Sequence, residues 1–236
     1  MPAKDTEAAE SAVARLHAHP GLQKHIGGPG LRNISLNERR NALLYVPESS
    51  LEQTAAPIAV MLHGAGGNAE HGIDLLRSYA DRARLILLAP ESRKASWDVI
   101  SDARYGADVG FIDECLTKVF AQFAIDPARI ALGGFSDGAS YALSLGLSNG
   151  LLFRTILAFS PGFMAPVRIE DTPKIFISHG TRDEVLPIDV CGRRLRKAIG
   201  THPQLTLNYR EFEGPHTVPA EMKEAALRLF LGEDSI

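Results

Sequence analysis

The chain has 236 residues, of which 45% are hydrophobic and 22% are charged, and its formal net charge is −3. This composition is that of a globular protein that can bury a core without disulfides, and the length suits one large domain. The small negative charge and the lack of a long Lys/Arg run argue against a nucleic-acid partner.

Cysteine use and hydropathy indicate where the protein works. Cys115 and Cys191 are the two cysteines, and they form neither a disulfide framework nor a CxxC motif. No apolar run approaches the ~18 residues that a membrane span needs, and residues 1–10 lack the apolar core of a signal peptide. We therefore expect a soluble, cytoplasmic protein. The oligomeric state stays open, with a homodimer as one alternative.

The expected elements begin after a peripheral N-terminal segment, residues 1–35, in which a polar helix over residues 1–19 precedes a Gly-Gly-Pro-Gly break. Residues 36–236 are expected to form a single domain of alternating strands and helices. Apolar runs typical of strands lie at residues 42–46, 58–62, 85–89, 130–133, 155–159, 174–178 and 205–212. Helices are expected near residues 69–82, 107–124, 137–149, 188–199 and 219–232.

Most of these runs are nearly continuous in Val, Ile, Leu, Ala or Phe, which is typical of parallel strands covered by helices on both faces. Strand–helix alternation over most of the chain predicts an α/β fold with a mostly parallel central sheet between helical layers. No connection is long enough for a large lid, so we expect an open site.

The pentapeptide Gly-Phe-Ser-Asp-Gly, residues 134–138, lies between a predicted strand and a predicted helix. Such a turn is tight, and glycines two residues before and after the serine relieve crowding across it. The hydroxyl of Ser136 is then exposed above the sheet, at a helix N-terminus that favours developing negative charge. Ser136 is therefore the candidate nucleophile; the alternative is a glycine-lined turn with an inert serine.

A serine nucleophile needs a base, and the base needs an orienting acid. Asp183 and His216 each follow a predicted strand, in the order Ser, Asp, His that this arrangement requires. Glu184 and Asp189 are the alternatives to Asp183, whose position favours it. Because active sites of open α/β sheets form at the carboxyl ends of the strands, we expect the three side chains to meet there. His63 and His179 also end strands, but each precedes Asp183 in the chain, and we interpret both as buried, hydrogen-bonded structural residues.

The loop His-Gly-Ala-Gly-Gly-Asn, residues 63–68, follows an early strand and lets backbone N–H groups face a ligand. We expect an oxyanion hole made by the backbone N–H groups of Asp137 and Ala65, with Gly66 as the alternative to Ala65. The loop has no dinucleotide or P-loop motif, so no nucleotide, metal or other cofactor is expected.

Four ordered segments carry a family resemblance: residues 62–67, 134–140, 179–183 and 214–219. They resemble the phospholipase/carboxylesterase family of α/β hydrolases, which includes acyl-protein thioesterases and small bacterial esterases. The resemblance covers about residues 40–232, and it implies an α/β-hydrolase fold with little or no lid and cofactor-free cleavage of carboxylic esters or thioesters. Acyl-protein thioesterases carry Gln after the nucleophile, whereas Asp137 is typical of the bacterial esterase-like members.

Three apolar side chains are candidate walls of a substrate pocket: Trp97, Phe163 and Leu186. Each lies in a loop after a predicted strand, at the expected active-site edge. The alternative for Trp97 is a core or rim position.

The predicted function is a serine carboxylesterase that acts on small-molecule esters with small or flexible acyl groups, through an acyl-enzyme. A thioesterase, lactone hydrolase or peptidase on the same scaffold is the enzymatic alternative, because all pass through the same kind of tetrahedral species. A catalytically silent binding protein is the alternative of another class.

Overall fold

The structure, a computed structural model, describes residues 14–21, 24–34 and 41–232. Within them, eight strands form one sheet: β1 (Gly30–Asn33), β2 (Ala42–Val46), β3 (Ala56–Leu62), β4 (Ile86–Pro90), β5 (Ile125–Phe135), β6 (Thr155–Phe159), β7 (Lys174–Gly180) and β8 (Thr206–Phe212). The strand order is β1-β2-β4-β3-β5-β6-β7-β8. In this order, β1 pairs with β2 and β2 with β4 in antiparallel fashion, and every pair from β4 through β3 to β8 is parallel.

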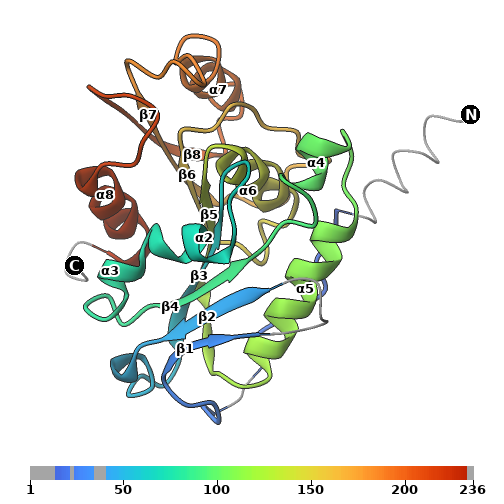
Figure 1. The fold of residues 1–236 in the computed structure, drawn as a ribbon, viewed down its shortest axis with the longest axis vertical. Coiled ribbons are helices and arrows are strands. Elements are labelled where there is room, and N and C mark those ends of the chain that lie inside the picture. Colours follow the sequence, from blue (N-terminus) through green and yellow to red (C-terminus); the bar gives the residue numbers. More distant parts are fainter. Residues whose placement is uncertain (1–13, 22–23, 35–40, 233–236) are drawn as a thin grey trace, which may run out of the picture.

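Helices cover both faces of the sheet (Figure 1). They are α2 (Ala69–Asp74), α3 (Arg77–Ala80), α4 (Asp98–Ser101), α5 (Ala107–Phe120), α6 (Asp137–Ser148), α7 (Gly192–Ile199) and α8 (Ala220–Leu231), with a 3-10 turn at Glu48–Ser50. The apolar side chains of α5, α6 and α7 belong to one core, and those of α2, α3 and α8 belong to the other. This is the predicted three-layer arrangement.

The two cores follow from the alternation of side chains along each strand. In β3, Ile58, Val60 and Leu62 enter the core under α5 and α6, whereas Ala59 and Met61 enter the core under α2 and α8. All seven residues of β3 are buried, so its sequence is a continuous apolar run instead of an alternating one.

The N-terminal segment differs from the expectation. Residues 1–13 of the expected helix lie outside the described residues, and residues 15–19 form no helix. Instead, Leu16 and Ala18 are buried in the core, and Asn149 accepts a 2.9 Å hydrogen bond from the backbone N–H of Leu16. Residues 30–33, expected to be peripheral, form the edge strand β1. The segment is held by partners far along the chain, which local sequence does not reveal.

Other boundaries shift by a few residues. The helix expected over 69–82 is two helices, α2 and α3, and the helix expected from 188 starts at Gly192. The connection between β6 and β7, residues 160–173, contains no helix. Of the helices in the described ranges, none has the length and apolarity to cross a membrane.

Candidate active site

Ser136 occupies the junction between β5, which ends at Phe135, and α6, which begins at Asp137. Its backbone has φ of 58° and ψ of −119°, a region that costs a residue with a side chain of order 1–3 kcal/mol. Hydrogen bonds hold it there: the Ser136 N–H donates to the Phe159 carbonyl at 2.9 Å, and the Ser140 N–H donates to the Ser136 carbonyl at 3.0 Å. This is the sharp strand-to-helix turn predicted for the serine.

The two flanking glycines are needed because the backbone comes too close for a side chain. A Cβ on Gly134 would lie 2.6 Å from the carbonyl oxygen of Gly138, across the turn. A Cβ on Gly138 would lie 2.3 Å from the Leu62 carbonyl oxygen and 2.5 Å from that of His63. All three distances are far below van der Waals contact, so Gly134 relieves crowding across the turn and Gly138 relieves crowding against the end of β3.

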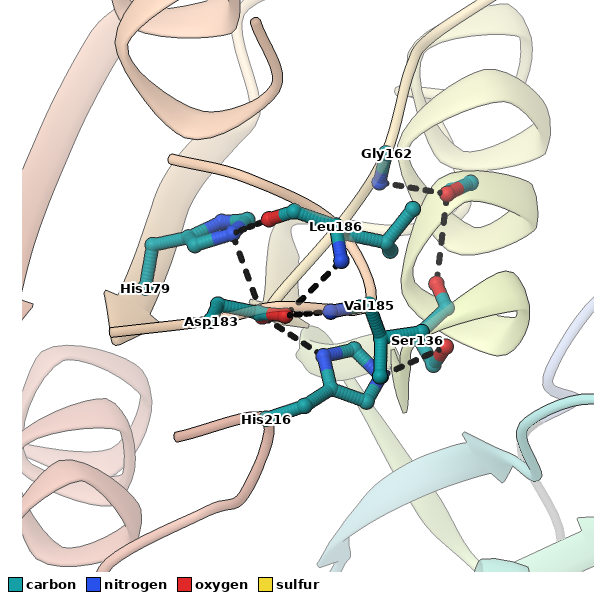
Figure 2. Close-up of polar contacts among 8 residues, drawn as sticks. Ser136, Gly162, His179, Asp183, Val185, Leu186 and His216 are labelled. Atoms are coloured by element: carbon teal, nitrogen blue, oxygen red, sulfur yellow. Dashed lines mark hydrogen bonds and ion pairs between the residues drawn. The ribbon is translucent and has the colours of Figure 1, made fainter. Parts of the chain in front are cut away.

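Ser136, His216 and Asp183 form a hydrogen-bonded row (Figure 2). The Ser136 Oγ lies 2.9 Å from His216 Nε2, and His216 Nδ1 lies 2.6 Å from Asp183 Oδ2. The Phe135 ring packs against the imidazole, with the ring centroids 4.6 Å apart. The structure therefore brings together all three residues predicted as a triad, from the loops after β5, β7 and β8.

Asp183 is buried, and both oxygens of its carboxylate have hydrogen-bond partners. Oδ1 accepts hydrogen bonds from the backbone N–H groups of Val185 at 3.0 Å and Leu186 at 2.8 Å. Oδ2 faces His216 and also lies 3.3 Å from Nε2 of His179, whose side chain is fully buried. Burial lowers the pKa of His179, against the raising effects of its bond to the Leu186 carbonyl and of the Asp183 charge, so this ring is neutral at neutral pH.

The acid loop and the histidine loop are joined by their backbones. The Thr181 N–H donates to the Phe212 carbonyl at 2.9 Å, and the Arg182 N–H donates to the Gly214 carbonyl at 3.0 Å. A Cβ on Gly180 would lie 2.4 Å from the Gly214 carbonyl oxygen, so only glycine permits this approach. The pairing of β7 with β8 thus continues into the site and sets the separation of Asp183 from His216.

The glycine loop after β3 lies against the nucleophile. A Cβ on Gly64 would come 3.3 Å from Cβ of Ser136. The Gly66 N–H donates to the Ala95 carbonyl at 2.6 Å, and Gly66 has a φ of 67° that glycine accepts at no steric cost. Gly66 therefore already has an acceptor within the protein, which leaves Ala65 as the candidate that faces a ligand.

The loop after β4, residues 91–97, is hydrogen-bonded both to the glycine loop and to the N-terminus of α6. Besides Ala95, which binds Gly66, Ser96 Oγ donates to Asp137 Oδ2 at 2.5 Å. The His63 ring is held at Nε2 by the Ser92 N–H at 3.0 Å, and its Nδ1 donates to the Gly64 carbonyl at 2.7 Å. His63 is buried, as is His179, and both are hydrogen-bonded, as we expected.

The expectation for Trp97 is wrong. Its side chain is 0% exposed, so it walls no open pocket. The indole stacks on Tyr141 with ring centroids 5.2 Å apart, and its Nε1–H donates to the His63 carbonyl at 2.9 Å. Trp97 thus lies beneath the glycine loop and supports it, because a buried indole N–H needs an acceptor and finds one there.

Phe163 and Leu186, the other two candidate pocket residues, follow β6 and β7, and Leu186 donates its N–H to Asp183. Phe163 is 36% exposed and lines a cavity of about 230 Å³. The cavity is bounded by Gly162, Phe163, Met164, Cys191, Arg194, Leu195 and Ala198. Leu186 packs on Gly162, since a Cβ there would lie 3.3 Å from Leu186 Cδ2.

Three serines at four-residue spacing on α6 bind the β6–β7 connection, which carries Phe163. The hydroxyls of Ser140, Ser144 and Ser148 each donate to the carbonyl four residues earlier. Each hydroxyl also accepts a backbone N–H from the β6–β7 connection, at 2.9, 2.9 and 3.1 Å. We did not predict this series of hydrogen bonds from the sequence, although the regular spacing of the serines is a visible signal.

The cysteines are free and buried, and they take no part in the row of Figure 2. Burial raises the pKa of Cys115 to about 12 and also raises that of Cys191, which disfavours the reactive thiolate. Among the described residues, no group of three or more His, Cys, Asp or Glu side chains is arranged to hold a metal ion.

Fold and site geometry together are those of an α/β hydrolase. Comparison with known proteins agrees: the model of the phospholipase/carboxylesterase family matches residues 101–229, which is more than half of the chain. The chain belongs to this family, and its predicted class, a carboxylic ester hydrolase, is confirmed. The search of curated proteins finds no match.

Solved structures of similar fold cover most of the chain. An S-formylglutathione hydrolase from Agrobacterium tumefaciens has a TM-score of 0.68 at 14% identity, covering 92% of this chain and 99% of its own. A phospholipase/carboxylesterase from Dyadobacter fermentans has 0.61 at 20% identity, covering 89% and 100%. Esterase PE8 has 0.57 at 22% identity, covering 85% and 97%. At these identities the likeness shows the fold, and the predicted α/β-hydrolase fold is confirmed.

Proposed function

We propose that the protein hydrolyses carboxylic esters of small-molecule substrates through an acyl-enzyme on Ser136. The observation that carries the proposal is the continuous row from Ser136 Oγ to His216 Nε2 at 2.9 Å and from His216 Nδ1 to Asp183 Oδ2 at 2.6 Å. All three residues come from one chain, so the chemistry does not require a homodimer.

In the first half-reaction, Ser136 Oγ attacks the ester carbonyl carbon while its proton moves to His216 Nε2. His216 then gives that proton to the leaving alcohol, and the acyl group stays on Ser136. In the second half-reaction, water attacks the acyl carbonyl carbon and passes a proton to His216 Nε2. His216 then gives that proton to Ser136 Oγ as the bond between Oγ and the acyl carbon breaks and the carboxylic acid leaves. Asp183 holds the proton-bearing Nδ1 toward itself, so that Nε2 faces the serine.

The negative charge on the tetrahedral oxygen needs fixed donors. We assign these to the backbone N–H groups of Asp137, at the N-terminus of α6, and of Ala65, since the Gly66 N–H is engaged with Ala95. Each such donor contributes about 3 kcal/mol to transition-state stabilisation. No metal or other cofactor enters these steps.

Loss of the Ser96 hydroxyl is expected to weaken this oxyanion hole. Ser96→Ala removes the 2.5 Å bond that ties Asp137 to the loop after β4, and we expect kcat to fall about 3- to 10-fold with little change in KM. The unfolding free energy should fall by about 1 kcal/mol. Steady-state kinetics and urea unfolding measure both.

Ser101→Ala is the matched control. Its hydroxyl donates to the Trp97 carbonyl at 3.2 Å in the same region, and not to Asp137 as the Ser96 hydroxyl does. The control should keep the wild-type kcat. A Ser96→Ala protein with unchanged kcat would show that this clamp does not matter to the reaction.

The acyl group is proposed to be small or flexible. Among the described residues, no connection between strands is long enough for a large lid over Ser136, and an open, shallow site favours small or flexible acyl groups. Across p-nitrophenyl esters, kcat/KM should therefore be highest for acetyl to butanoyl and fall at least about tenfold for dodecanoyl. A preference for dodecanoyl would contradict the small-acyl proposal.

Thioesters are the second candidate substrates. Two structures of similar fold are S-formylglutathione hydrolases, from Agrobacterium tumefaciens and Staphylococcus aureus, and the same triad chemistry opens a thioester. Matched acetyl thioesters, lactones and anilides in the same assay rank the alternatives.

We also infer a cytoplasmic location, because both cysteines are free thiols.

A further inference from the structure

His179 is a second histidine on the carboxylate of Asp183, and the reaction scheme above does not use it. It is the penultimate residue of β7, four positions before Asp183, and its side chain is 0% exposed. Its Nε2 lies 2.7 Å from the Leu186 carbonyl oxygen and 3.3 Å from Asp183 Oδ2. Figure 2 shows it on the opposite side of Asp183 from His216.

These contacts close a ring within the acid loop. The Leu186 N–H donates to Asp183 Oδ1 at 2.8 Å, and the Leu186 carbonyl accepts from His179 Nε2. The same Nε2 faces Asp183 Oδ2, so one imidazole contacts both the carboxylate and Leu186, the residue whose N–H binds that carboxylate. Without that donor, the Leu186 carbonyl would be left without its partner and the loop from 183 to 186 could rotate.

The proton on His179 must lie on Nε2, because that atom faces two oxygens. Nδ1 has no hydrogen-bond partner among the described residues and is packed against Gly192, where a Cβ would lie 2.8 Å from it. The same Cβ would lie 2.9 Å from the Tyr209 hydroxyl oxygen. With the proton on Nε2, Nδ1 is an acceptor, and no second buried N–H is left without a partner. His179 is thus a fixed donor with one orientation.

We infer that His179 is a positioning residue: by donating from Nε2 to the Leu186 carbonyl and Asp183, it fixes the carboxylate that orients His216. This inference rests on the proposed function for its kinetic consequence. Its structural consequence, the state of the His216–Asp183 hydrogen bond, exists in the resting protein and is measurable without any substrate.

The test compares His179→Leu, which removes the donor at similar volume, with His179→Gln, whose amide nitrogen reaches the place of Nε2. For His179→Leu we expect kcat to fall about 10- to 100-fold with KM within about twofold, because a displaced general base costs rate more than binding. His179→Gln should recover kcat to within about threefold of wild type. The downfield proton NMR signal of His216 Nδ1–H should shift or broaden in His179→Leu and return in His179→Gln.

His25→Leu is the matched control, since it also removes a histidine bond to a backbone carbonyl, that of Gln53 at 3.0 Å, but far from the triad. It should keep both kcat and the NMR signal. If His179→Leu does not fold, His179→Asn, whose amide is too short to reach Leu186, replaces it. Retention of kcat and of the downfield signal in a folded non-donor variant would overturn the inference, as would equal losses in His179→Gln and His179→Leu.

The two readouts separate this inference from the proposed function. A wild-type protein without esterase activity, but with a downfield signal that depends on the residue at 179 as described, would contradict the function and support the positioning role. An active wild-type protein whose downfield signal does not depend on residue 179 would support the proposed function and contradict the positioning role.

Discussion

Replacing Ser136 with alanine is expected to lower kcat for p-nitrophenyl butanoate about a millionfold, to the residual rate that binding and the oxyanion hole provide. The hydroxyl is the attacking group, and no neighbouring side chain can replace it: Ser140 donates its hydroxyl to the Ser136 carbonyl at 3.2 Å and accepts the Gly162 N–H. Burst-corrected steady-state assays with purified variant measure the loss.

The fold should survive this change. Alanine meets the same φ of 58° as serine, and the serine side chain makes no helix-capping bond. Because the hydrogen bond to His216 is lost, the unfolding free energy should fall by no more than about 1 kcal/mol. Ser49→Ala, which removes a hydroxyl bonded to the Asp81 carbonyl outside the triad loops, serves as the control and should keep full activity. A Ser136→Ala protein with even a tenth of wild-type kcat would rule Ser136 out as nucleophile.

Gly138→Ala is expected to have the second-largest effect, although it removes no functional group. The new methyl would lie 2.3 Å from the Leu62 carbonyl oxygen, which is backbone at the end of the central strand and cannot turn aside. The N-terminus of α6 must therefore move, taking Ser136 and the Asp137 N–H with it. We expect kcat/KM to fall at least about 100-fold and the unfolding free energy to fall by about 3 kcal/mol.

Gly110→Ala is the control, and we expect it to raise the unfolding free energy that Gly138→Ala lowers. Gly110 is an exposed residue of α5, and nothing lies within 4 Å of a Cβ placed there. This substitution should stabilise the protein by about 0.5–1 kcal/mol and leave kinetics unchanged. Unfolding curves and kcat/KM for both alanine variants check the contrast; similar behaviour of the two would contradict the steric account of the elbow.

The strands were predictable where burial is uniform. β6 has the expected bounds, Thr155–Phe159, because all five residues are buried and four of them are apolar. β1 was missed because it is an edge strand that begins with glycine and leaves Leu31 56% exposed, so it carries no apolar run. The packing of Leu16 and Ala18 was also missed, because their partners, Asn149 and Asp113, lie far along the chain.

The triad residues could be singled out because each stands at a position that chain order and strand ends define. Trp97 was placed in the right loop but given the wrong exposure, since its burial depends on Tyr141 and the His63 carbonyl from other elements. The choice between Ala65 and Gly66 needed the Gly66–Ala95 hydrogen bond, which spacing does not reveal. For the same reason His179 could be read as buried and bonded, but its contact with Asp183 could not.

The proposed mechanism depends most on Ser136 being the residue that carries the acyl group. Incubation with a fluorophosphonate, digestion and mass spectrometry measure this directly. We predict one phosphonylated peptide, modified at Ser136, in the wild-type protein and none in Ser136→Ala. An unlabelled wild-type protein, or labelling that persists in Ser136→Ala, would contradict it.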